Sequence, residues 1–569
     1  MEYFESLPWY RKNVIYQIYP WSFKDSNGDG VGDLRGIIEK LDYLNDGPDS
    51  LNVGAIWLSP VYPSPMKDFG YDISDYCNID PRFGSLEDFD ELVEKAHARD
   101  VRIIMDLVTN HTSIEHPWFK ESRSSRKNPK RDWYIWHDPK PDGSPPNNWI
   151  SVSGGPMWTL DETTNQYYLH NFLPCQPDLN WRNKEVQEEM KKVIEFWIKR
   201  GVDGFRVDAA SHFMEDTEFR DDPINLHYIK GKNSPYDQFL HTFSTNQPGI
   251  KEVIGLMCNI ADQNKDVFIV SEAYLSLEDM AKFYRFCETP VHAPFNFSLL
   301  HLPWRAKEIR EAIDAYDKTL EPQDIPTYVL GNHDNSRVAS RRGIAQARAS
   351  AVLLLTLRGT PFIYYGEELG MQDVGIPKKQ LKDGFIETSD GVFSRDPERT
   401  PMQWDSSKHA GFTSGEPWLP LSKDYETLNV EHQATDRHSM LNLYKTIIKF
   451  RNTSNALLHG TYRSIDTKSP DVYGFIRESN TEKLLILINF SNDIVTEPFN
   501  FVLGKMVVST YMDHMNLPVA QEITLRAHEA CIISLTNLKV VERASMQKTQ
   551  SGFARLVGKL LHTFSLGYN

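Results

Sequence analysis

Up to about residue 460, the hydrophobic pattern of the chain alternates between two periods. Short apolar runs rich in Val, Ile and Phe, typical of strands, are followed by segments whose apolar residues recur at helical spacing. The predicted strands cover 14–19, 55–58, 101–108, 204–207, 267–270, 327–330 and 361–365, and the predicted helices cover 34–44, 86–98, 186–199 and 347–357. This alternation implies an α/β fold in which helical crossovers join parallel strands. About eight such units favour a (β/α)8 TIM barrel. The rival is a doubly wound sheet, but no G-x-G-x-x-G phosphate loop follows the first strand.

Two later changes of pattern divide the chain further. Residues 110–179 are dense in Pro, Asn, Trp and Gly, which predicts a loop-rich insertion after strand 3, on the catalytic face of the barrel. Short alternating runs at 472–477, 483–489, 505–511 and 530–535 predict a small antiparallel β domain. We therefore expect the barrel in 1–109 and 180–460, the inserted subdomain in 110–179, the β domain in 461–540 and a tail in 541–569.

The tail has an amphipathic pattern. Its apolar face consists of Phe553, Leu556, Val557, Leu560, Leu561 and Phe564. We expect a helix that docks on the protein's own surface or on a second subunit of a homo-oligomer. The sequence leaves open whether the protein is a monomer or a homo-oligomer. A helix lying on a membrane is the alternative, but its basic face is thin.

Charge and composition exclude several classes of function. The net charge of −16 argues against nucleic acid, whose phosphates need clusters of Lys and Arg, and it suits a neutral substrate. No apolar run is long enough to form a transmembrane span. Residues 1–10 are acidic and aromatic, unlike a signal peptide, so we expect a cytoplasmic protein. The five widely spaced cysteines form neither a disulfide framework nor a zinc pattern, and we expect buried, reduced thiols.

Polar stretches follow four of the predicted strands, at 106–111, 204–208, 270–274 and 332–334. In a barrel, polar residues at the carboxyl ends of the strands converge on one site. Any single carboxylate here could be a helix cap or a surface charge. Together the stretches contribute the residues His111, Arg206, Asp208, Glu272, His333 and Asp334.

These stretches resemble the characteristic regions of the α-amylase family of glycoside hydrolases (family 13). Residues 14–20 (Val-Ile-Tyr-Gln-Ile-Tyr-Pro) resemble the first barrel strand of that family. Three further segments resemble its α-glucosidase and oligo-1,6-glucosidase branch: Gln-Pro-Asp-Leu-Asn at 176–180, Gly-Thr-Pro-Phe-Ile-Tyr-Tyr-Gly-Glu at 359–367, and Arg-Asp-Pro-Glu-Arg-Thr-Pro-Met-Gln-Trp at 395–404. The resemblance runs from about Trp9 to the final β domain and does not include the tail.

The resemblance implies a retaining, exo-acting α-glucosidase that releases glucose from short α-glucosides. Asp208 is then the nucleophile, Glu272 the acid and base, and Asp334 the group that binds the ring hydroxyls in the transition state. The role of Glu272 requires a raised pKa. Arg206 lies two residues before Asp208 on one strand, so both side chains face the same way, and its charge would keep Asp208 ionised.

The resemblance also implies a pocket for one glucosyl unit. His111 and His333 would grip the sugar in the first subsite, Tyr71 would stack on its ring, and Phe172 would line the pocket. Asp68 and Arg399 would close the pocket behind the non-reducing end, which restricts attack to terminal glucose.

Ala209, directly after the nucleophile, bears on linkage preference. Relatives tend to carry Val here when they cut α-1,6 bonds and Thr when they prefer α-1,4 bonds. The smaller Ala leaves more room at the leaving-group subsite, so we expect a tolerant enzyme. Maltose and sucrose are the main candidate substrates, with isomaltose as a further one.

Two other activities stay open on the same scaffold. Sucrose isomerisation and trehalose synthesis share the covalent intermediate and differ only in the acceptor, but the chain lacks the Arg-Leu-Asp-Arg-Asp stretch associated with sucrose isomerases. Non-catalytic, transporter-associated relatives need a membrane span and usually lose catalytic carboxylates, whereas Asp208, Glu272 and Asp334 are all retained.

The loop at 25–33 begins like a D-x-[DN]-x-[DN]-G calcium loop, but its twelfth position is Gly36 instead of Glu, so it is not an EF-hand. In the glucosidase branch the same loop resembles a structural Ca²⁺ site. Its ligands would be Asp25, Asn27, Asp29, the carbonyl of Val31, and Asp33. Mg²⁺ is an alternative ion, and a Gly-Asp turn without metal is the other interpretation.

Overall fold

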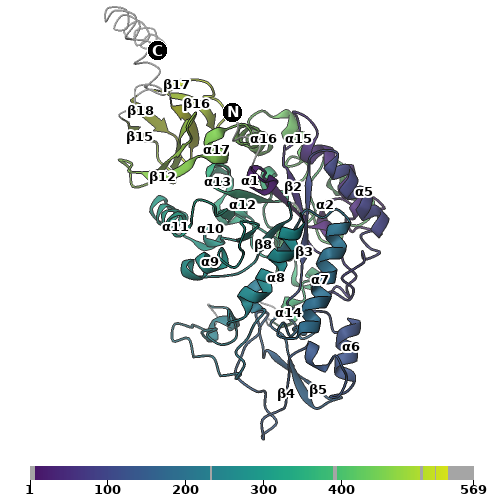
Figure 1. Ribbon diagram of the computed structural model, residues 1–569. Coiled ribbons are helices and arrows are strands. Elements are labelled where there is room, and N and C mark those ends of the chain that lie inside the picture. Colours follow the sequence, from purple (N-terminus) through teal and green to yellow (C-terminus); the bar gives the residue numbers. More distant parts are fainter. Residues whose placement is uncertain are drawn as a thin grey trace, which may run out of the picture.

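The computed structural model describes residues 7–230, 233–264, 266–388, 394–499, 504–519 and 521–535 (Figure 1). The predicted tail at 541–569, with its expected contact to a second subunit, lies outside these residues. Within the described ranges, no helix combines the length and the apolar character that a membrane crossing requires.

Eight parallel strands form the central sheet, in the order β10-β11-β1-β2-β3-β7-β8-β9. Their bounds are β1 Ile15–Ile18, β2 Ala55–Leu58, β3 Arg102–Leu107, β7 Gly204–Val207, β8 Phe268–Ser271, β9 His292–Pro294, β10 Thr327–Val329 and β11 Thr360–Tyr364. A parallel bridge between Asn296 and Tyr328 joins the end of β9 to β10 and closes the sheet. This confirms the predicted (β/α)8 barrel.

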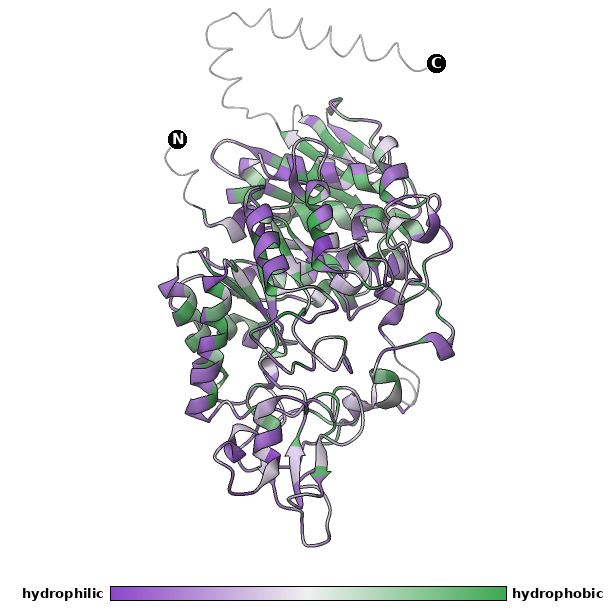
Figure 2. Ribbon diagram, turned by 90° about the vertical axis from the view of Figure 1, so that its right-hand side faces the viewer, coloured by the Kyte–Doolittle hydropathy of each residue, from purple (hydrophilic) through white to green (hydrophobic). Residues whose placement is uncertain are grey.

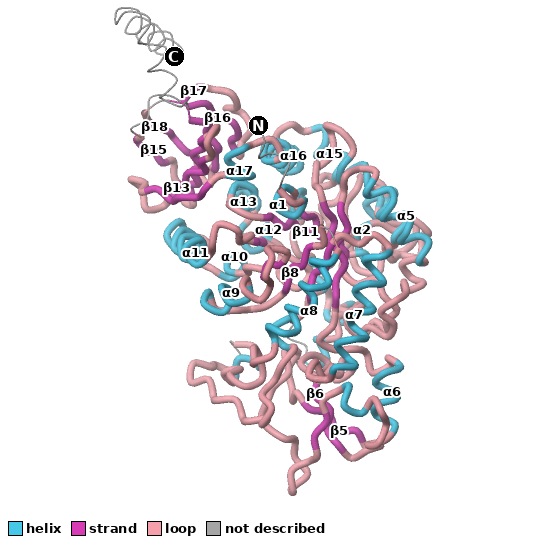
Figure 3. The backbone as a smooth tube through the Cα atoms, viewed as in Figure 1, coloured by secondary structure: helices cyan, strands magenta, loops and turns pink. Residues whose placement is uncertain are grey.

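Helices surround these strands (Figure 3). Those of the barrel region are α1 Trp9–Lys12, α2 Pro20–Phe23, α3 Leu34–Glu39, α4 Leu41–Asn45, α5 Leu86–His97, α7 Lys184–Lys199, α8 Ile250–Gln263, α9 Leu277–Phe283, α10 Ser298–His301, α11 Ala306–Thr319, α12 Val338–Arg342, α13 Ile344–Thr356, α14 Phe385–Thr388, α15 Val430–Thr435, α16 Met440–Arg451 and α17 Asn455–His459. The residues of β2, β7 and β8 are buried throughout, as expected for parallel strands covered on both faces.

The sequence pattern located seven of the eight barrel strands, and the helices α3, α4, α5, α7 and α13, to within a few residues. The predicted helix at 34–44 is two helices, because Lys40 leaves helical geometry with ψ of 8° between α3 and α4. The pattern missed β9, since three residues that include His and Pro carry no periodic signal. It also left the other helices of the barrel region unassigned, including the long helices α8, α11 and α16.

The segment between β3 and α7 is a separate lobe at the carboxyl end of the barrel, at the bottom of Figure 2. It contains α6 Pro117–Ser124 and an antiparallel sheet in the order β4-β6-β5, with bounds β4 Trp136–His137, β5 Trp158–Asp161 and β6 Gln166–Leu169. Ile135, Trp149, Met157, Trp158, Tyr167 and Leu169 form its own apolar cluster. An antiparallel bridge between His111 and Asp178 ties its two ends together beside β3.

The C-terminal part is an antiparallel β domain, as predicted. Its main sheet has the order β12-β13-β14-β19-β16-β17, and β15 pairs with β18. The bounds are β12 Thr461–Ile465, β13 Val472–Glu478, β14 Lys483–Asn489, β15 Val495–Pro498, β16 Gly504–Ser509, β17 Pro518–Val519, β18 Glu522–Leu525 and β19 Ala530–Leu535. The sheet packs on α13 of the barrel through β14 and β19.

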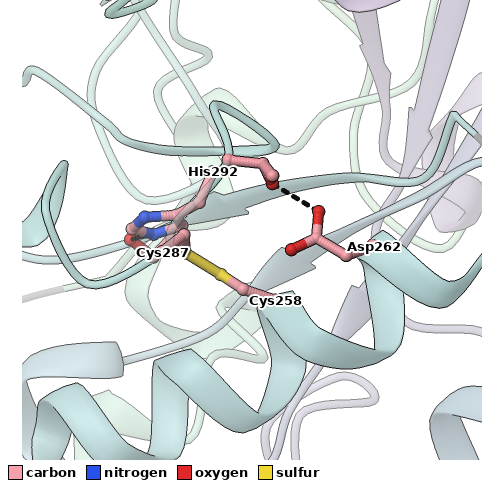
Figure 4. The surroundings of a disulfide bond; sticks show 6 residues. Cys258, Asp262, Cys287 and His292 are labelled. Carbon is pink, nitrogen blue, oxygen red and sulfur yellow. Dashed lines mark hydrogen bonds between the residues drawn. A yellow bond between two sulfur atoms is a disulfide. The ribbon is translucent and has the colours of Figure 1, made fainter.

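A disulfide joins Cys258 to Cys287 (Figure 4). It connects α8, which precedes β8, to the segment that precedes β9. The expectation of five reduced thiols is therefore wrong for these two, because tertiary packing pairs cysteines that lie 29 residues apart in the chain. Cys77, Cys175 and Cys531 are free, as expected.

Candidate active site

The carboxyl ends of neighbouring strands bring the predicted carboxylates together. Asp208 directly follows β7 and Glu272 directly follows β8. The backbone ladder continues through both residues, since the Asp208 amide donates to Leu107 O at 3.1 Å and the Glu272 amide donates to Val207 O at 2.8 Å. Strand register, rather than loop conformation, therefore sets their spacing.

Arg206 is the centre of the carboxylate cluster. Its Nη1 lies 2.6 Å from Asp208 Oδ1 and 2.8 Å from Asp106 Oδ1, and its Nη2 lies 2.6 Å from Glu272 Oε2. The Arg206 side chain is only 1% exposed. Trp57 covers the guanidinium, with its ring centroid 5.2 Å away. A buried cation thus holds three carboxylates in one arrangement.

Burial raises the pKa of both predicted catalytic carboxyls. Burial raises the pKa of Asp208 to about 7, against the lowering effect of Arg206. Burial raises the pKa of Glu272 to about 8, again opposed by Arg206 and reinforced by the charges of Asp208 and Asp334. The carboxyl that must donate a proton is thus the one that holds its proton more tightly.

Asp334 has the opposite electrostatic environment. Burial alone would raise its pKa, but His333, Arg395 and Arg399 outweigh burial and hold the pKa well below the usual range. Arg399 Nη2 lies 2.9 Å from Asp334 Oδ1, and His333 Nε2 lies 3.2 Å from Asp334 Oδ2. Gln17 contacts the other ring nitrogen of His333 at 2.9 Å. Asp334 is therefore ionised at neutral pH.

At the rear of the site, Asp68 pairs with Arg395, whereas Arg399 pairs with Asp334. Arg395 Nη2 lies 2.6 Å from Asp68 Oδ1, and the same arginine contacts Asp334 at 3.1 Å and Asp383 at 2.7 Å. Arg399 is fully buried behind Asp334, where its Nε donates to His333 O at 2.7 Å. Both arginines lie in the same motif, but the chain path directs Arg395 to Asp68.

The expected sugar-contacting side chains lie around these charges. Tyr71 stacks on the His333 ring with centroids 5.2 Å apart, and its hydroxyl donates to Asp106 Oδ2 at 2.9 Å. The Phe172 ring lies 5.2 Å from His111. Burial lowers the pKa of His111 to about 3, so this ring is a neutral hydrogen-bonding group.

A cavity of about 700 Å³ opens over these residues. Its lining includes all the predicted catalytic and sugar-binding residues except Arg206, Ala209 and Arg399. The described wall consists of Asp68, Tyr71, His111, Val152, Ser153, Phe172, Asp208, Tyr228, Lys230, Asn233, Ser234, Pro235, Glu272, Tyr274, His333, Asp334, Asn335, Phe385 and Arg395. This is a deep, mixed polar and apolar pocket of the size that small-molecule ligands occupy.

Comparisons with known proteins identify the family of the chain. The family model for the alpha amylase catalytic domain matches residues 17–460. The chain belongs to the α-amylase family. It is 40% identical to a probable alpha-glucosidase of Rhizobium meliloti over 89% of this chain and 94% of that protein. It is 38% identical to an oligo-1,6-glucosidase of Heyndrickxia coagulans over 93% of this chain and 99% of that protein.

A solved structure of the same family also superposes closely. The crystal structure of an alpha-glucosyl transfer enzyme, XgtA, has a TM-score of 0.87 at 39% identity, covering 93% of this chain and 100% of that one. As a member of the α-amylase family, the protein is a glycoside hydrolase.

Ala209, the residue after the predicted nucleophile Asp208, has an unusual backbone conformation. Its φ is 49°, in the left-handed region that residues with a Cβ adopt only at some cost. This turn points its backbone amide at Glu272 Oε2, 3.2 Å away. The Ala209 side chain is buried and does not line the cavity. No direct contact therefore supports the predicted effect of Ala209 on the leaving-group subsite.

Several side chains of the site were not predicted. Gln176 Nε2 donates to Asp68 Oδ2 at 2.9 Å and contacts His111, and it lies in the Gln-Pro-Asp-Leu-Asn segment that carried the resemblance. Arg395 likewise begins a quoted motif. Tyr228 and Pro235 line the cavity from the long segment between β7 and α8, which carries no motif.

The loop at 25–33 turns its oxygen side chains onto its own backbone. Asp25 Oδ1 accepts from the amides of Asn27 and Gly28, and Asp29 Oδ1 accepts from Val31. Among the described residues, no three Asp, Glu, His or Cys side chains are gathered as metal ligands. Calcium thus remains a prediction from the residue pattern.

Proposed function

We propose that this protein is a retaining, exo-acting α-glucosidase that releases terminal glucose from short α-glucosides. Maltose and sucrose are the main candidate substrates, with isomaltose as a further one. The observation that carries the proposal is the contact of Asp208 and Glu272 with one guanidinium, at 2.6 Å each. Retaining glycosidases need closely spaced carboxyls, whereas inverting ones leave room for a water between them.

The chemistry follows from the protonation states. Protonated Glu272 gives its proton to the glycosidic oxygen while ionised Asp208 attacks the anomeric carbon, and the glycosidic bond breaks. Glu272, now ionised, removes a proton from water, whose oxygen displaces Asp208 and forms glucose. Asp334 stays ionised throughout and accepts hydrogen bonds from ring hydroxyls of the distorted sugar.

The arrangement behind the glucosyl site supports exo attack on short substrates. The Asp68–Arg395 ion pair, with Gln176 donating to Asp68, occupies the position where a further sugar at the non-reducing end would have to pass. Both charged side chains are less than a tenth exposed. We infer that this pair closes the cavity behind one terminal glucosyl unit.

Glucosyl transfer on the same scaffold is the second candidate, because the structurally similar XgtA is named an alpha-glucosyl transfer enzyme. Incubation with maltose and with sucrose, followed by product analysis, separates the two functions. Hydrolysis predicts that glucose is the main product and that each glucosyl unit transferred to water is accompanied by one released leaving group. Mainly new disaccharides would assign the protein to the transferases, and turnover by Asp208→Asn at the wild-type rate would refute Asp208 as nucleophile.

We also propose that the loop at 25–33 binds Ca²⁺ in a structural role, through Asp25, Asn27, Asp29, the Val31 carbonyl and Asp33. Support comes from oxygen donors at alternate positions, which suit a hard cation. Asp33 is also the N-cap of α3, the helix that follows the loop. A bound ion would therefore stabilise the start of this helix. Cytoplasmic localisation remains a prediction from residues 1–10.

A further inference from the structure

Gln17 lies on β1 of the barrel and does not line the cavity. The strand ladder fixes its backbone, because Gln17 pairs in register with Trp57 of β2 and Tyr364 of β11. The residue is only 1% exposed. Its Nε2 lies 2.9 Å from His333 Nδ1 and donates to Ser59 Oγ at 3.3 Å. Gln17 can therefore act on the proposed substrate only through His333.

The His333 ring has a different partner at each nitrogen. Gln17 lies at Nδ1, and Asp334 Oδ2 lies 3.2 Å from Nε2. Two aromatic rings stack on the imidazole: Tyr71 with an interplanar angle of 4° and Tyr19 with an angle of 17°, at centroid distances of 5.2 and 6.0 Å. The side chain is 1% exposed, so water cannot exchange freely for these partners.

The His333 ring is neutral. Burial lowers its pKa well below the ordinary histidine value, and the positive charges of Arg399, Arg206 and Arg395 lower it further. Asp334 opposes them, because a nearby carboxylate favours the charged ring, but burial and the three arginines outweigh Asp334. A neutral imidazole has a proton on one nitrogen only, so the other nitrogen can only accept a hydrogen bond.

The neighbours of the two nitrogens decide which one carries the proton. An ionised carboxylate has no proton to donate, so Nε2, the nitrogen beside Asp334, must be the donor. Nδ1 must then accept, and the amide nitrogen of Gln17 is a donor. The reverse orientation of the amide would place its oxygen against Nδ1, where neither atom could donate. Both neighbours therefore agree with one form of the ring.

Asp334 favours a second proton on the ring, and Gln17 opposes it. A charged imidazolium would carry a proton on Nδ1 as well as on Nε2. The Nδ1 proton would face the amide protons of Gln17 at the present distance of 2.9 Å between the nitrogens. A donor that faces a donor is unfavourable, and a hydrogen bond to the neutral form disfavours the charged form.

We propose that Gln17 is a positioning residue that holds the His333 ring in its neutral form with the single proton on Nε2. This inference rests on the proposed function, in which His333 contacts the glucosyl unit. The Nε2–H donor and the Asp334 acceptor then lie side by side in the cavity wall, and this pair matches two neighbouring sugar hydroxyls, one accepting and one donating. A neutral ring also leaves the charge of Asp334 uncompensated, so that it can stabilise the positive charge developing on the sugar.

Nitrogen NMR of protein with isotope-labelled histidine detects these protons directly. The signals of His333 are those missing from the spectrum of His333→Ala. In the wild type we expect a proton on Nε2 and none on Nδ1, even at about pH 6, where an ordinary histidine is mostly charged. In Gln17→Met the ring should take up its second proton at a higher pH than in the wild type, because the opposing donor is gone.

Hydrolysis of maltose shows whether the effect passes through the ring. Gln17→Met should lower kcat/KM by about tenfold, which is the effect expected when a buried acceptor loses its partner. In a His333→Ala background the same change should lower kcat/KM by less than about twofold, because the ring through which Gln17 acts is absent. Gln433→Met is the matched control and should leave kcat/KM unchanged. Gln433 is 8% exposed, lies outside the cavity lining and donates to Leu369 O at 2.8 Å.

A proton on Nδ1 in the wild type at about pH 7 would overturn the proposal. Unchanged protonation of the ring in Gln17→Met, or an equal loss of kcat/KM in both backgrounds, would also overturn it. If Gln17→Met does not fold, Gln17→Asn takes its place with the same expectations, because its amide is one methylene shorter. Failure of the wild type to hydrolyse any α-glucoside would refute the proposed function, whereas the NMR spectra would still decide whether Gln17 holds the ring.

Discussion

Arg206 Nη2 lies 2.6 Å from Glu272 Oε2, so the proposed proton donor is in direct contact with a buried cation. A cation stabilises the ionised form of a carboxyl, yet the pKa of Glu272 is raised to about 8, because burial outweighs Arg206. Arg206 thus limits how far burial raises the pKa of both proposed catalytic carboxyls.

Replacement of Arg206 by Met should move the activity to higher pH. Removal of the positive charge raises the pKa of Asp208 and of Glu272, so Asp208 is largely protonated at neutral pH and cannot attack. We expect kcat/KM at pH 7 to fall by at least about 100-fold, with the pH–rate profile displaced upward. Arg200→Met is a matched control, since Arg200 pairs with Asp90 on the surface. An unshifted profile in Arg206→Met would show that Arg206 does not tune the pair.

The pH dependence of the wild-type enzyme should be bell-shaped. Activity is lost as pH falls through the pKa of Asp208, about 7, because the nucleophile becomes protonated. It is lost again as pH rises through the pKa of Glu272, about 8, because the acid loses its proton. We expect a narrow optimum between these values in kcat/KM for maltose.

Glu272→Gln provides the check on the alkaline limb. An activated aryl glucoside has a leaving group that needs no proton. With this substrate, the rate at which the variant forms the intermediate should no longer fall at alkaline pH. Maltose cleavage should fall by at least about 1,000-fold. Retention of the alkaline limb in this variant would assign that limb to another group.

Some of this site could be predicted from the sequence and some could not. Asp208, Glu272 and Asp334 follow strands, and in a barrel strand ends meet, so a one-dimensional pattern was enough to group them. The contact of Arg395 with Asp68 depends on the path of one loop across the barrel mouth. The spacing of two arginines within a motif contains no such information.

The fold shows the same division. Long apolar strands such as β3 were predicted from their period, whereas β9 is too short to have one. The Cys258–Cys287 bond depends on how α8 packs against the segment before β9. Tyr274 was part of a quoted stretch, but only the structure reveals that its ring stays open to solvent.

Arg395 should be important for stability as well as for binding. Its side chain is 7% exposed and pairs with Asp68, Asp334 and Asp383. Arg395→Met leaves three carboxylates without this cation, which should lower the free energy of unfolding by about 3–5 kcal/mol. The pKa of Asp383 is held well below its usual range by Arg395, so this stability is present above about pH 4 and is lost as pH falls further. Urea unfolding at pH 7 and at low pH measures both effects.

The control for this prediction is Arg285→Met. Arg285 makes a two-point ion pair with Asp324 at the other end of the barrel region, and its side chain is 38% exposed. Arg285→Met should lower the free energy of unfolding less than Arg395→Met does, and it should leave KM for maltose unchanged. Arg395→Met should raise that KM at least about tenfold. Equal effects of the two variants on KM would contradict the placement of Arg395 at the glucosyl site.

Removal of divalent cations tests the proposed calcium site. If Ca²⁺ binds the native loop and not the unfolded chain, chelation should lower Tm by a few degrees, and added Ca²⁺ should restore it. The pH–rate profile should keep its shape, because the loop contains no acid or base of the reaction. Asp29→Ala, at an exposed position, should abolish the response to Ca²⁺. No response in the wild type, and no calcium bound by calorimetry, would leave the loop as a metal-free turn.

The central claim is that Asp208 forms a covalent bond to the sugar. Glu272→Gln can be incubated with α-glucosyl fluoride, whose leaving group needs no acid, and then acid-quenched, digested and mapped by mass spectrometry. We predict one added glucosyl unit on the peptide that contains Asp208, and none in Asp208→Asn. A glucosyl unit on a peptide that contains Asp106 or Asp334 instead, or release of inverted glucose without any adduct, would contradict it.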